Sequence, residues 1–361
     1  MKKNSKNASL VTKPRRTVGL DLGDRFCQYC ILDEAGEVME EGRTKTEESA
    51  LRKHFANEER MRIAMECGTH SPWISRLLEK LGHEVIVANA RKLKGVTQEE
   101  VRNDRRDAEQ LAQLAYTNPK LLRGIRHRSA ERQRDLTVVQ ARATLVRART
   151  MIINATRGLV KSGGGRLPKC STQSFVGKVK PHLPAELAEL IGPMVDQVEL
   201  LTEQIAKLDQ QIEALAKRYP EIRTLRTMPG VGPLVAATYV LTLNGADAVR
   251  HSRSAGAFLG LGPRKKQSGD SDPQCGITHA GNNYLRSLLV QSAHHILGYR
   301  GPDSALRRWG LKLASSGGKR GKKRAVVAVA RKVAVILHCL WRTGESYQTF
   351  PQGRVAAPSQ V

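Results

Sequence analysis

The sequence has few aromatic side chains, few cysteines and no long apolar run. Only 4% of its 361 residues are Phe, Trp or Tyr, so a platform of aromatic rings stacked on bases is a poor model for any nucleic-acid contact. No apolar run approaches the ~18 residues that cross a bilayer, and the basic amino terminus lacks the apolar core of a signal peptide. Six scattered cysteines do not form a disulfide framework in a chain of this length. These absences argue against a membrane or secreted protein and favour a cytoplasmic one.

Acidic residues are also scarce, because 34 Asp and Glu stand against 60 Lys and Arg, a formal net charge of +26. The excess is greatest at the rear of the chain: residues 221–361 hold 21 basic and 6 acidic side chains, a net charge of +15. Residues 1–130 hold 25 and 19, a net charge of +6. This distribution predicts that the rear half contacts a phosphate backbone. The alternative is a generally basic protein with no specific partner.

The front of the chain alternates between strand and helix patterns. Residues 17–44 show the alternation of three strands joined by tight turns, which predicts an antiparallel meander. The next expected elements are a helix at 48–56, a strand at 62–66, a helix from Ser71-Pro72 to Gly82 and a strand at 84–88. Three antiparallel strands followed by alternating helix and strand are typical of an RNase H-like fold.

From about Glu131 the pattern becomes helical. The apolar residues of its clearest part are spaced alternately three and four apart, and they are Val198, Leu201, Ile205, Leu208, Ile212 and Leu215. This heptad seam predicts two helices that form either an antiparallel hairpin within the chain or a coiled coil with another copy. The whole pattern predicts an α/β plus α fold, divided into a basic tail (1–14), an RNase H-like domain (15–129), a coiled-coil region (130–219), a mainly helical domain (220–345) and a flexible tail (346–361).

Four acids of the front domain are candidate catalytic residues. Asp21 ends the first apolar strand, Glu66 ends a later one, and Asp104 and Asp107 share a face at a helix start. If they converge, their oxygens suit two Mg²⁺ ions about 4 Å apart. The alternative is that the strand-end acids are surface residues and that the Asp pair only favours its helix start. Beside that pair, Arg102, Arg105 and Arg106 either face a nucleic-acid backbone or belong to a solvated helix surface.

Three segments of the rear half are candidate nucleic-acid contacts. Residues 225–243 read as helix, hairpin and helix, and the glycines of PGVG let backbone N–H groups approach a phosphate. A polar loop between apolar helices holds serines among cations, and a basic arm precedes the last helix. The candidate binding residues are Gly230, Gly232, Arg264, Lys265, Lys266, Arg286, Lys319, Arg320, Lys322, Lys323 and Arg324. A loop serine framed by cations is able to approach a phosphodiester.

Two other interpretations of the front domain are weaker. A GxDxG sequence after a first strand also opens sugar-kinase and actin-like ATPases, but the rear of this chain offers helices and basic charge instead of a second such domain. Cys27 and Cys30 have a CxxC spacing, yet they fall in an expected strand, where positions i and i+3 face opposite sides. No second pair exists in the sequence, so zinc is disfavoured.

Together these motifs resemble one family, the DEDD-type insertion-sequence transposases, which are bridge-RNA-guided recombinases of bacterial mobile elements. The resemblance covers most of the chain: GLDLGD, AMECGTHSPW, NDRRDAEQLAQL, the heptad region, MPGVGP and the long block LGLGPRKKQSGDSDPQCGITHAGNNYLRSLL. One departure is His279, which stands in the GIT-x-x-G segment where members often have Lys or Arg.

The resemblance implies a RuvC-like front domain with the four acids as Mg²⁺ ligands. It also implies a nucleophilic serine in the rear transposase domain, best matched by Ser268, with Ser271 as the alternative. The two half-sites are expected to meet between subunits of a homo-oligomer, a dimer or tetramer. Attack by the serine would give a covalent phosphoserine link and a free hydroxyl end. A structured non-coding guide RNA would pair with double-stranded donor and target DNA, and the protein would associate with the bacterial nucleoid when active.

Two other functions use the same residues differently. A RuvC-like, structure-selective endonuclease would hydrolyse DNA with water at the carboxylate site and need no serine. A nucleic-acid scaffold would use neither site for chemistry. Substitution of the serine separates recombinase from nuclease, and substitution of the acids separates both from a scaffold.

Overall fold

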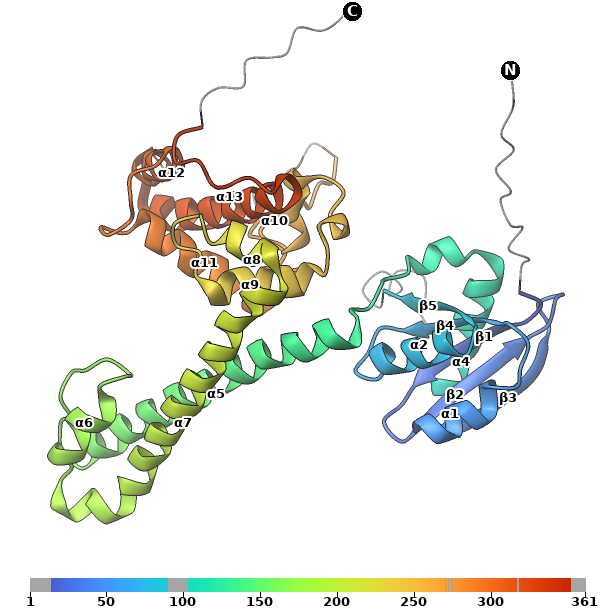
Figure 1. Cartoon of the computed structure of the whole chain (residues 1–361), viewed down its shortest axis with the longest axis horizontal. Coiled ribbons are helices and arrows are strands. Elements are labelled where there is room, and N and C mark those ends of the chain that lie inside the picture. Colours follow the sequence, from blue (N-terminus) through green and yellow to red (C-terminus); the bar gives the residue numbers. More distant parts are fainter. Residues whose placement is uncertain are drawn as a thin grey trace, which may run out of the picture. The chain divides into compact units, whose positions relative to one another are not determined.

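The computed structural model describes residues 14–89, 103–269, 271, 273, 275–316 and 318–351. The chain divides into two compact units on either side of the Ala130–Glu131 peptide bond (Figure 1). The first contains a mixed sheet with helices, and the second is helical. In the part of the chain that the structure describes, no helix is both long and apolar enough to span a bilayer.

The first unit is built on a five-stranded sheet, shown in blue in Figure 1. Its strands are β1 (Thr17–Leu22), β2 (Phe26–Leu32), β3 (Val38–Lys45), β4 (Arg62–Glu66) and β5 (Glu84–Ala88). In the order β3-β2-β1-β4-β5, the first three strands pair antiparallel, and β4 is parallel to both β1 and β5. The expected meander and the two later strands are confirmed. This sheet is compatible with an RNase H-like α/β fold.

Helices cover the sheet on both faces. The side chains of Val18 and Leu20 pack with those of α1 (Glu48–Phe55) and α2 (Ser71–Lys80). The opposite face carries α4 (Asp104–Thr117), which is followed by the 3₁₀ turn η1 (Pro119–Leu122). Cys27 lies in the first of these cores and Cys30 in the second. The two cysteines therefore face opposite sides of β2, as the strand pattern predicts.

Gly19 lets α4 lie directly against β1. A Cβ atom at this position would be 1.9 Å from the carbonyl oxygen of Ala108 and 2.5 Å from the backbone nitrogen of Ala112. Both atoms belong to the backbone of α4, so the helix itself would have to move. The glycine of GLDLGD thus fixes the distance between the strand that carries Asp21 and the helix that carries the Asp pair.

We expect Gly19→Ala to destabilise the first unit by about 2 kcal/mol or more, because the added methyl group would clash with backbone atoms, which cannot rotate away as a side chain can. The thermal unfolding midpoint measures the loss. Gly68→Ala is the matched control, since an added Cβ there has no heavy atom within 4 Å. Equal midpoints for the two variants would contradict the close contact between β1 and α4.

The second unit begins with a long helical hairpin. The helices α5 (Ala130–Ser162) and α7 (Ala185–Arg218) run antiparallel (Figure 1). Two contacts between them show this orientation: Arg142 pairs with Asp209, and Arg149, later in α5, donates to Thr202, earlier in α7. The segment between them holds α6 (Phe175–Val179) and η2 (Lys180–His182). Of the expected seam, Leu208 is half-buried and the other five residues are buried. The heptad seam therefore has its partner within the chain.

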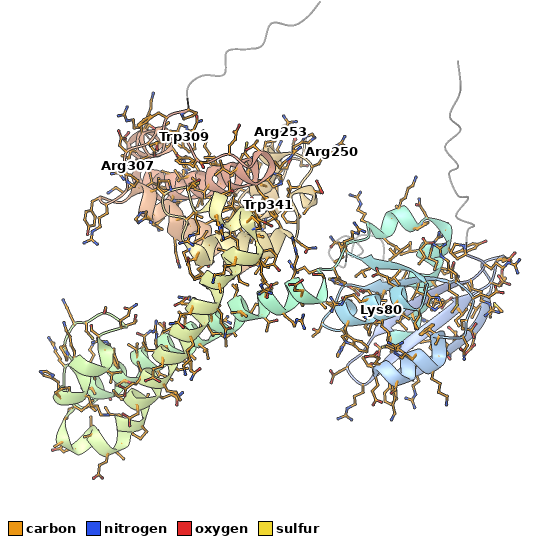
Figure 2. All side chains as sticks on the ribbon, in the orientation of Figure 1. Lys80, Arg250, Arg253, Arg307, Trp309 and Trp341 are labelled. Atoms are coloured by element: carbon orange, nitrogen blue, oxygen red, sulfur yellow. The ribbon has the colours of Figure 1, made fainter. Side chains whose placement is uncertain are left out.

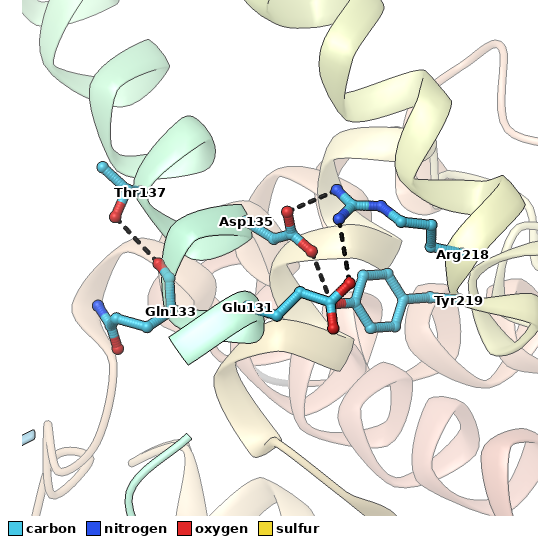
Figure 3. Close-up of polar contacts among 6 residues, drawn as sticks. All are labelled: Glu131, Gln133, Asp135, Thr137, Arg218 and Tyr219. Carbon is cyan, nitrogen blue, oxygen red and sulfur yellow. Dashed lines mark hydrogen bonds and ion pairs between the residues drawn. The ribbon is translucent and has the colours of Figure 1, made fainter. Parts of the chain in front are cut away.

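A buried acid, Asp135, joins the start of α5 to the end of α7 (Figure 3). Asp135 is 5% exposed; it accepts 2.5 Å and 2.6 Å hydrogen bonds from Arg218 and from the hydroxyl of Tyr219. Arg218 also reaches Glu131 at 3.4 Å. Burial and the bond to Asp135 raise the pKa of Tyr219 to about 12. A buried carboxylate needs such partners because an unpaired one is costly, so the cluster ties the start of α5 to the end of α7.

The rest of the second unit forms one apolar core. Its elements are α8 (Pro220–Leu225), α9 (Pro233–Leu243), η3 (Ala246–Ala248), η4 (Ser252–Ser254), α10 (Ala255–Phe258), α11 (Asn283–Leu297), α12 (Ala305–Ser316), η5 (Gly318–Arg320) and α13 (Gly321–Thr343). Val329 and Val333 of α13 are fully buried in one cluster with residues of α9 and α11, and Leu136 and Leu215 of the helical hairpin are buried in the same cluster. One face of α13 is therefore part of the apolar core of the second unit.

Candidate active site and nucleic-acid interface

Asp21 and Glu66 lie at the same edge of the sheet. The strands β1 and β4 are parallel neighbours with Leu20 opposite Met65, so the next residue of each strand is one of the two acids. Alternation along a strand places Asp21 on the face of Gly19 and Glu66 on the face of Ala64, which is the face covered by α4. Asp21 is half-buried and Glu66 is exposed. The sheet register alone thus brings the first two acids together.

The helix α4 brings the other two. Its N-cap is Asn103, whose side chain accepts a hydrogen bond from the backbone nitrogen of Arg105, and Asp104 and Asp107 occupy the first turn. Acids are favoured at this position because the backbone N–H groups of a first turn carry partial positive charge. The structure therefore has a local reason to begin a helix here, and its contact with β1 carries both acids to the edge where Asp21 lies.

The electrostatics of Asp21 show that the four acids interact. Burial raises the pKa of Asp21 to about 6, with further contributions from the charges of Asp104, Asp107 and Glu66. Like charges without a counter-cation repel one another. Within residues 14–89 and 103–130, none of the four forms an ion pair with Lys, Arg or His. This set of hard oxygen donors with unbalanced negative charge fits a divalent cation. Across the described ranges, no three acidic, His or Cys side chains already form a chelating group.

The cations beside these acids have different surroundings. Arg105 pairs with Glu41 of β3, a carboxylate whose side chain is 18% exposed. Arg106 is exposed, and Arg102 lies outside the described residues. Arg105 therefore has an acidic partner within the first unit. The spacing of charges in the sequence did not indicate this pairing.

The candidate serine lies in a short hairpin of the second unit, which we call the serine hairpin (the described residues of 261–279). Its arms are joined by a bridge between Pro263 and Ile277 and by a 2.8 Å bond from the Arg264 nitrogen to the Gly276 carbonyl. At its tip, Ser268 and Ser271 each donate a backbone N–H to the other's carbonyl at 3.1 Å. Both serines are exposed. The structure thus presents both hydroxyl-bearing residues to solvent at one turn.

The cations of the hairpin arm and α11 differ in exposure. Arg264, Lys265 and Lys266 are exposed along one arm. Arg286 is only 6% exposed, and its guanidinium donates to the carbonyls of Leu259 and Ala280 at 3.0 Å and 2.7 Å. Arg286 therefore differs from the cations of the hairpin arm in being buried, and its expected contact with nucleic acid stays a prediction. Its guanidinium links the residues that flank the serine hairpin, and it also donates to the side-chain oxygen of Asn283 at 2.9 Å. Buried polar groups are normally hydrogen-bonded in this way.

The MPGVGP segment forms the turn between α8 and α9. Gly230 has a φ of +80°, a backbone conformation that favours glycine, and Gly232 is the N-cap of α9. A hollow of about 500 Å³ lies against this turn, lined also by Arg226 and His295. The sequence analysis singled out neither residue: Arg226 follows α8 just before the turn, whereas His295 of α11 reaches the turn only through tertiary packing.

The basic arm adjoins a larger groove. Arg320, Lys323 and Arg324 line a hollow of about 1180 Å³, together with three cations that charge clustering in the sequence did not single out: Arg253, Arg331 and Lys332. Lys322 is exposed and lies outside this lining. Lys319 lies at a position whose side chain is outside the described part of the chain. Figure 2 labels Arg253, which belongs to η4 and lies 67 positions before Arg320 in the sequence.

Comparisons with known proteins find similarity to transposases. A DEDD transposase model of the IS110 type matches residues 18–163, and a model described as "Transposase IS116/IS110/IS902 family" matches residues 222–307. A probable family 20 transposase of Pseudomonas aeruginosa is 30% identical over 332 residues, which cover 90% of this chain and 96% of that protein. The transposase for insertion sequence element IS1111A of Coxiella burnetii is 28% identical over 93% of this chain and 92% of its own length.

The first model spans the sheet and the four acids, and the second spans the MPGVGP turn and the serine hairpin. Each matched segment therefore contains one of the two groups of candidate site residues. With similarity to transposases along nearly the whole chain, the protein belongs to the IS110-type family of DEDD insertion-sequence transposases, enzymes that move DNA.

Proposed function

We propose that this transposase cleaves and exchanges DNA strands with a Mg²⁺–carboxylate site and a serine nucleophile, directed by an RNA encoded by its own element. The observation that carries the proposal is the mutual repulsion of Asp21 with Asp104, Asp107 and Glu66 at one edge of the sheet. In the described part of the first unit these acids have no cationic partner, and such like charges near one another cost stability; a cation-dependent reaction gives a reason for the arrangement.

The proposed roles follow from the chemistry of each group. Asp21, Glu66, Asp104 and Asp107 hold the divalent ions, and these ions, when bound, neutralise charge on the phosphodiester and its leaving oxygen. The Ser268 hydroxyl loses its proton and forms a bond to phosphorus, while one phosphorus–deoxyribose oxygen bond breaks. The leaving oxygen takes up a proton and becomes a free hydroxyl end. A hydroxyl end of another strand then reverses the step, which restores Ser268 and completes the exchange.

Basic side chains supply the electrostatic part of this function. The exposed cations of the serine hairpin and the basic arm suit phosphate contacts, which carry no sequence information by themselves. Base pairing by a guide RNA to the element ends and to the target supplies sequence choice in the proposal. We further propose that the active species is a dimer or tetramer of this chain.

A recombination assay with two plasmids tests the function. One plasmid carries the element ends, the other a target, and the purified protein is supplied with Mg²⁺ and RNA transcribed from the structured DNA flanking the gene. We expect joined products only when protein, RNA and Mg²⁺ are all present. Joined products without the RNA, or in excess chelator, would contradict guidance or the metal role. A scrambled RNA of the same length is the control.

A further inference from the structure

A large hollow of the second unit lies along one side of α13 and next to the serine hairpin. We call it the α13 groove: it has a volume of about 1180 Å³ and lies between α13, Trp309 of α12, Arg253 of η4 and the arms of the serine hairpin. The hairpin contributes Pro263, Ile277 and His279. Sites that bury one small ligand measure ~300–1,000 Å³, so the α13 groove has room for a larger or extended ligand.

The rim of the α13 groove is cationic. Six Lys and Arg side chains line it, and no acidic side chain is among the described residues of its lining. They are Arg253, Arg320, Lys323, Arg324, Arg331 and Lys332. Arg253, Arg324 and Arg331 are exposed, and in the described part of the second unit none of the six is ion-paired with an acid. The rim therefore presents positive charge that the described part of the unit does not neutralise.

The arrangement along α13 explains how the rim is held. Residues 320, 324, 327, 331 and 335 recur at helical spacing, so they share one face. The stem of Arg331 crosses Gly256, where a Cβ would be 2.5 Å from the Arg331 Cγ. The Lys332 ammonium lies 4.2 Å from the ring centre of Trp309. Packing of these stems fixes two of the cations at the groove edge.

The floor of the α13 groove is apolar. Val327, Val335 and Ile336 of α13 line the groove together with the cations, and Leu261 and Ile277 line it from the serine hairpin; we call this apolar part of the lining the floor. The three α13 residues are only half-buried, so the floor keeps apolar surface in contact with water. A duplex presents phosphates outward and keeps the faces of its bases stacked inside, so it cannot place base faces on this surface. An unpaired strand offers both phosphates for a rim and base faces for a floor.

We propose that the α13 groove binds an unpaired stretch of nucleic acid, with its phosphates on the cationic rim and its bases against the apolar floor. This inference rests on the proposed function in that strand exchange produces unpaired strands, and it adds where one of them is held. The arms of the serine hairpin line the groove, so a strand bound there lies against the hairpin that carries Ser268.

Binding of labelled oligonucleotides to the full-length protein tests the inference. Fluorescence anisotropy compares a short single strand of oligothymidylate, an oligouridylate of the same length and a DNA hairpin duplex over a series of salt concentrations. Arg324→Gln removes a rim cation. Ala328→Trp fills the floor without changing charge, and Val327→Asn makes the floor polar if the larger residue disturbs folding. Lys312→Gln is the matched control, because Lys312 is an exposed cation of α12 outside the groove lining.

The rim and floor variants should act differently on the single strand. Removing one phosphate contact should lower the slope of log affinity against log salt by about 0.7. The floor variants should weaken binding about tenfold, through lost burial of apolar surface, at an unchanged slope. Lys312→Gln should leave both quantities unchanged. Tighter binding of oligouridylate or of oligothymidylate identifies the strand as RNA or DNA, and either result supports the inference.

Two results would overturn it. Unchanged single-strand affinity in both folded floor variants would show that no base lies on the floor. An equal loss of single-strand and duplex binding would show that the groove does not distinguish unpaired strands. The proposed function fails separately, because it requires joined plasmid products, whereas this measurement needs neither catalysis nor Mg²⁺.

Discussion

Ser268→Ala is expected to abolish strand exchange, by at least about 10³-fold, and to remove any covalent protein–DNA species. The physical reason is that alanine lacks the hydroxyl that would form the bond to phosphorus. The backbone of the turn should persist, because Ser268 and Ser271 are joined there through backbone N–H groups and carbonyls. Denaturing electrophoresis of the reaction mixture measures the covalent species, and joined plasmids measure exchange.

Ser271→Ala is the matched control, since Ser271 is exposed at the same turn and makes the same pair of backbone bonds. We expect this variant to retain exchange. If Ser271→Ala instead loses strand exchange and Ser268→Ala retains it, Ser271 is the nucleophile. Strand cleavage by Ser268→Ala without a covalent species would instead favour the nuclease, in which water attacks the phosphodiester at the carboxylate site.

Asp21→Asn should abolish DNA cleavage and yet stabilise the metal-free protein. Asp21 is half-buried and is repelled by three other acids, so its charge opposes folding when no cation is bound. Neutralising it should raise the thermal midpoint in chelator by about 3 °C, since exposure to solvent limits the gain to roughly 1 kcal/mol. Added Mg²⁺ should raise the midpoint of the wild type more than that of the variant.

Asp24→Asn separates a cation site from a general loss of acidic charge. Asp24 lies three residues further along the chain, and its side chain is 95% exposed beside His70. We expect this variant to keep the wild-type response to Mg²⁺ and the wild-type cleavage rate. A lower midpoint for metal-free Asp21→Asn, or undiminished cleavage by it, would contradict the view that these acids repel one another and serve the reaction.

Local patterns in the sequence predicted the elements well. Alternation and turn residues predicted the five strands of the first unit, and heptad spacing predicted the seam of α7. They did so because period and punctuation depend on neighbours along the chain. The sequence also placed Asp21 and Glu66 at strand ends, but only the structure shows that β1 and β4 are parallel neighbours, which brings the two acids to one edge.

Exposure and pairing were harder to predict. Arg105 and Arg286 looked alike in the sequence, as cations near candidate site residues. One pairs with Glu41, 64 positions away, and the other is buried against the carbonyl of Leu259. Whether a cation is exposed or paired depends on which distant segment packs beside it. Composition alone does not predict that contact. For the same reason, Arg253 was not associated with the basic arm, although both line the α13 groove.

The sequence by itself determined the order of strands and helices, the placement of acids at strand and helix ends, and the basic character of the rear half. Only the tertiary structure decided that the heptad seam closes within the chain, through contacts such as Arg142 with Asp209. It also decided that Arg286 is buried and that α13 leaves an apolar floor open beside six cations. Local periodicity fixes which residues share a face, whereas long-range packing determines what that face meets.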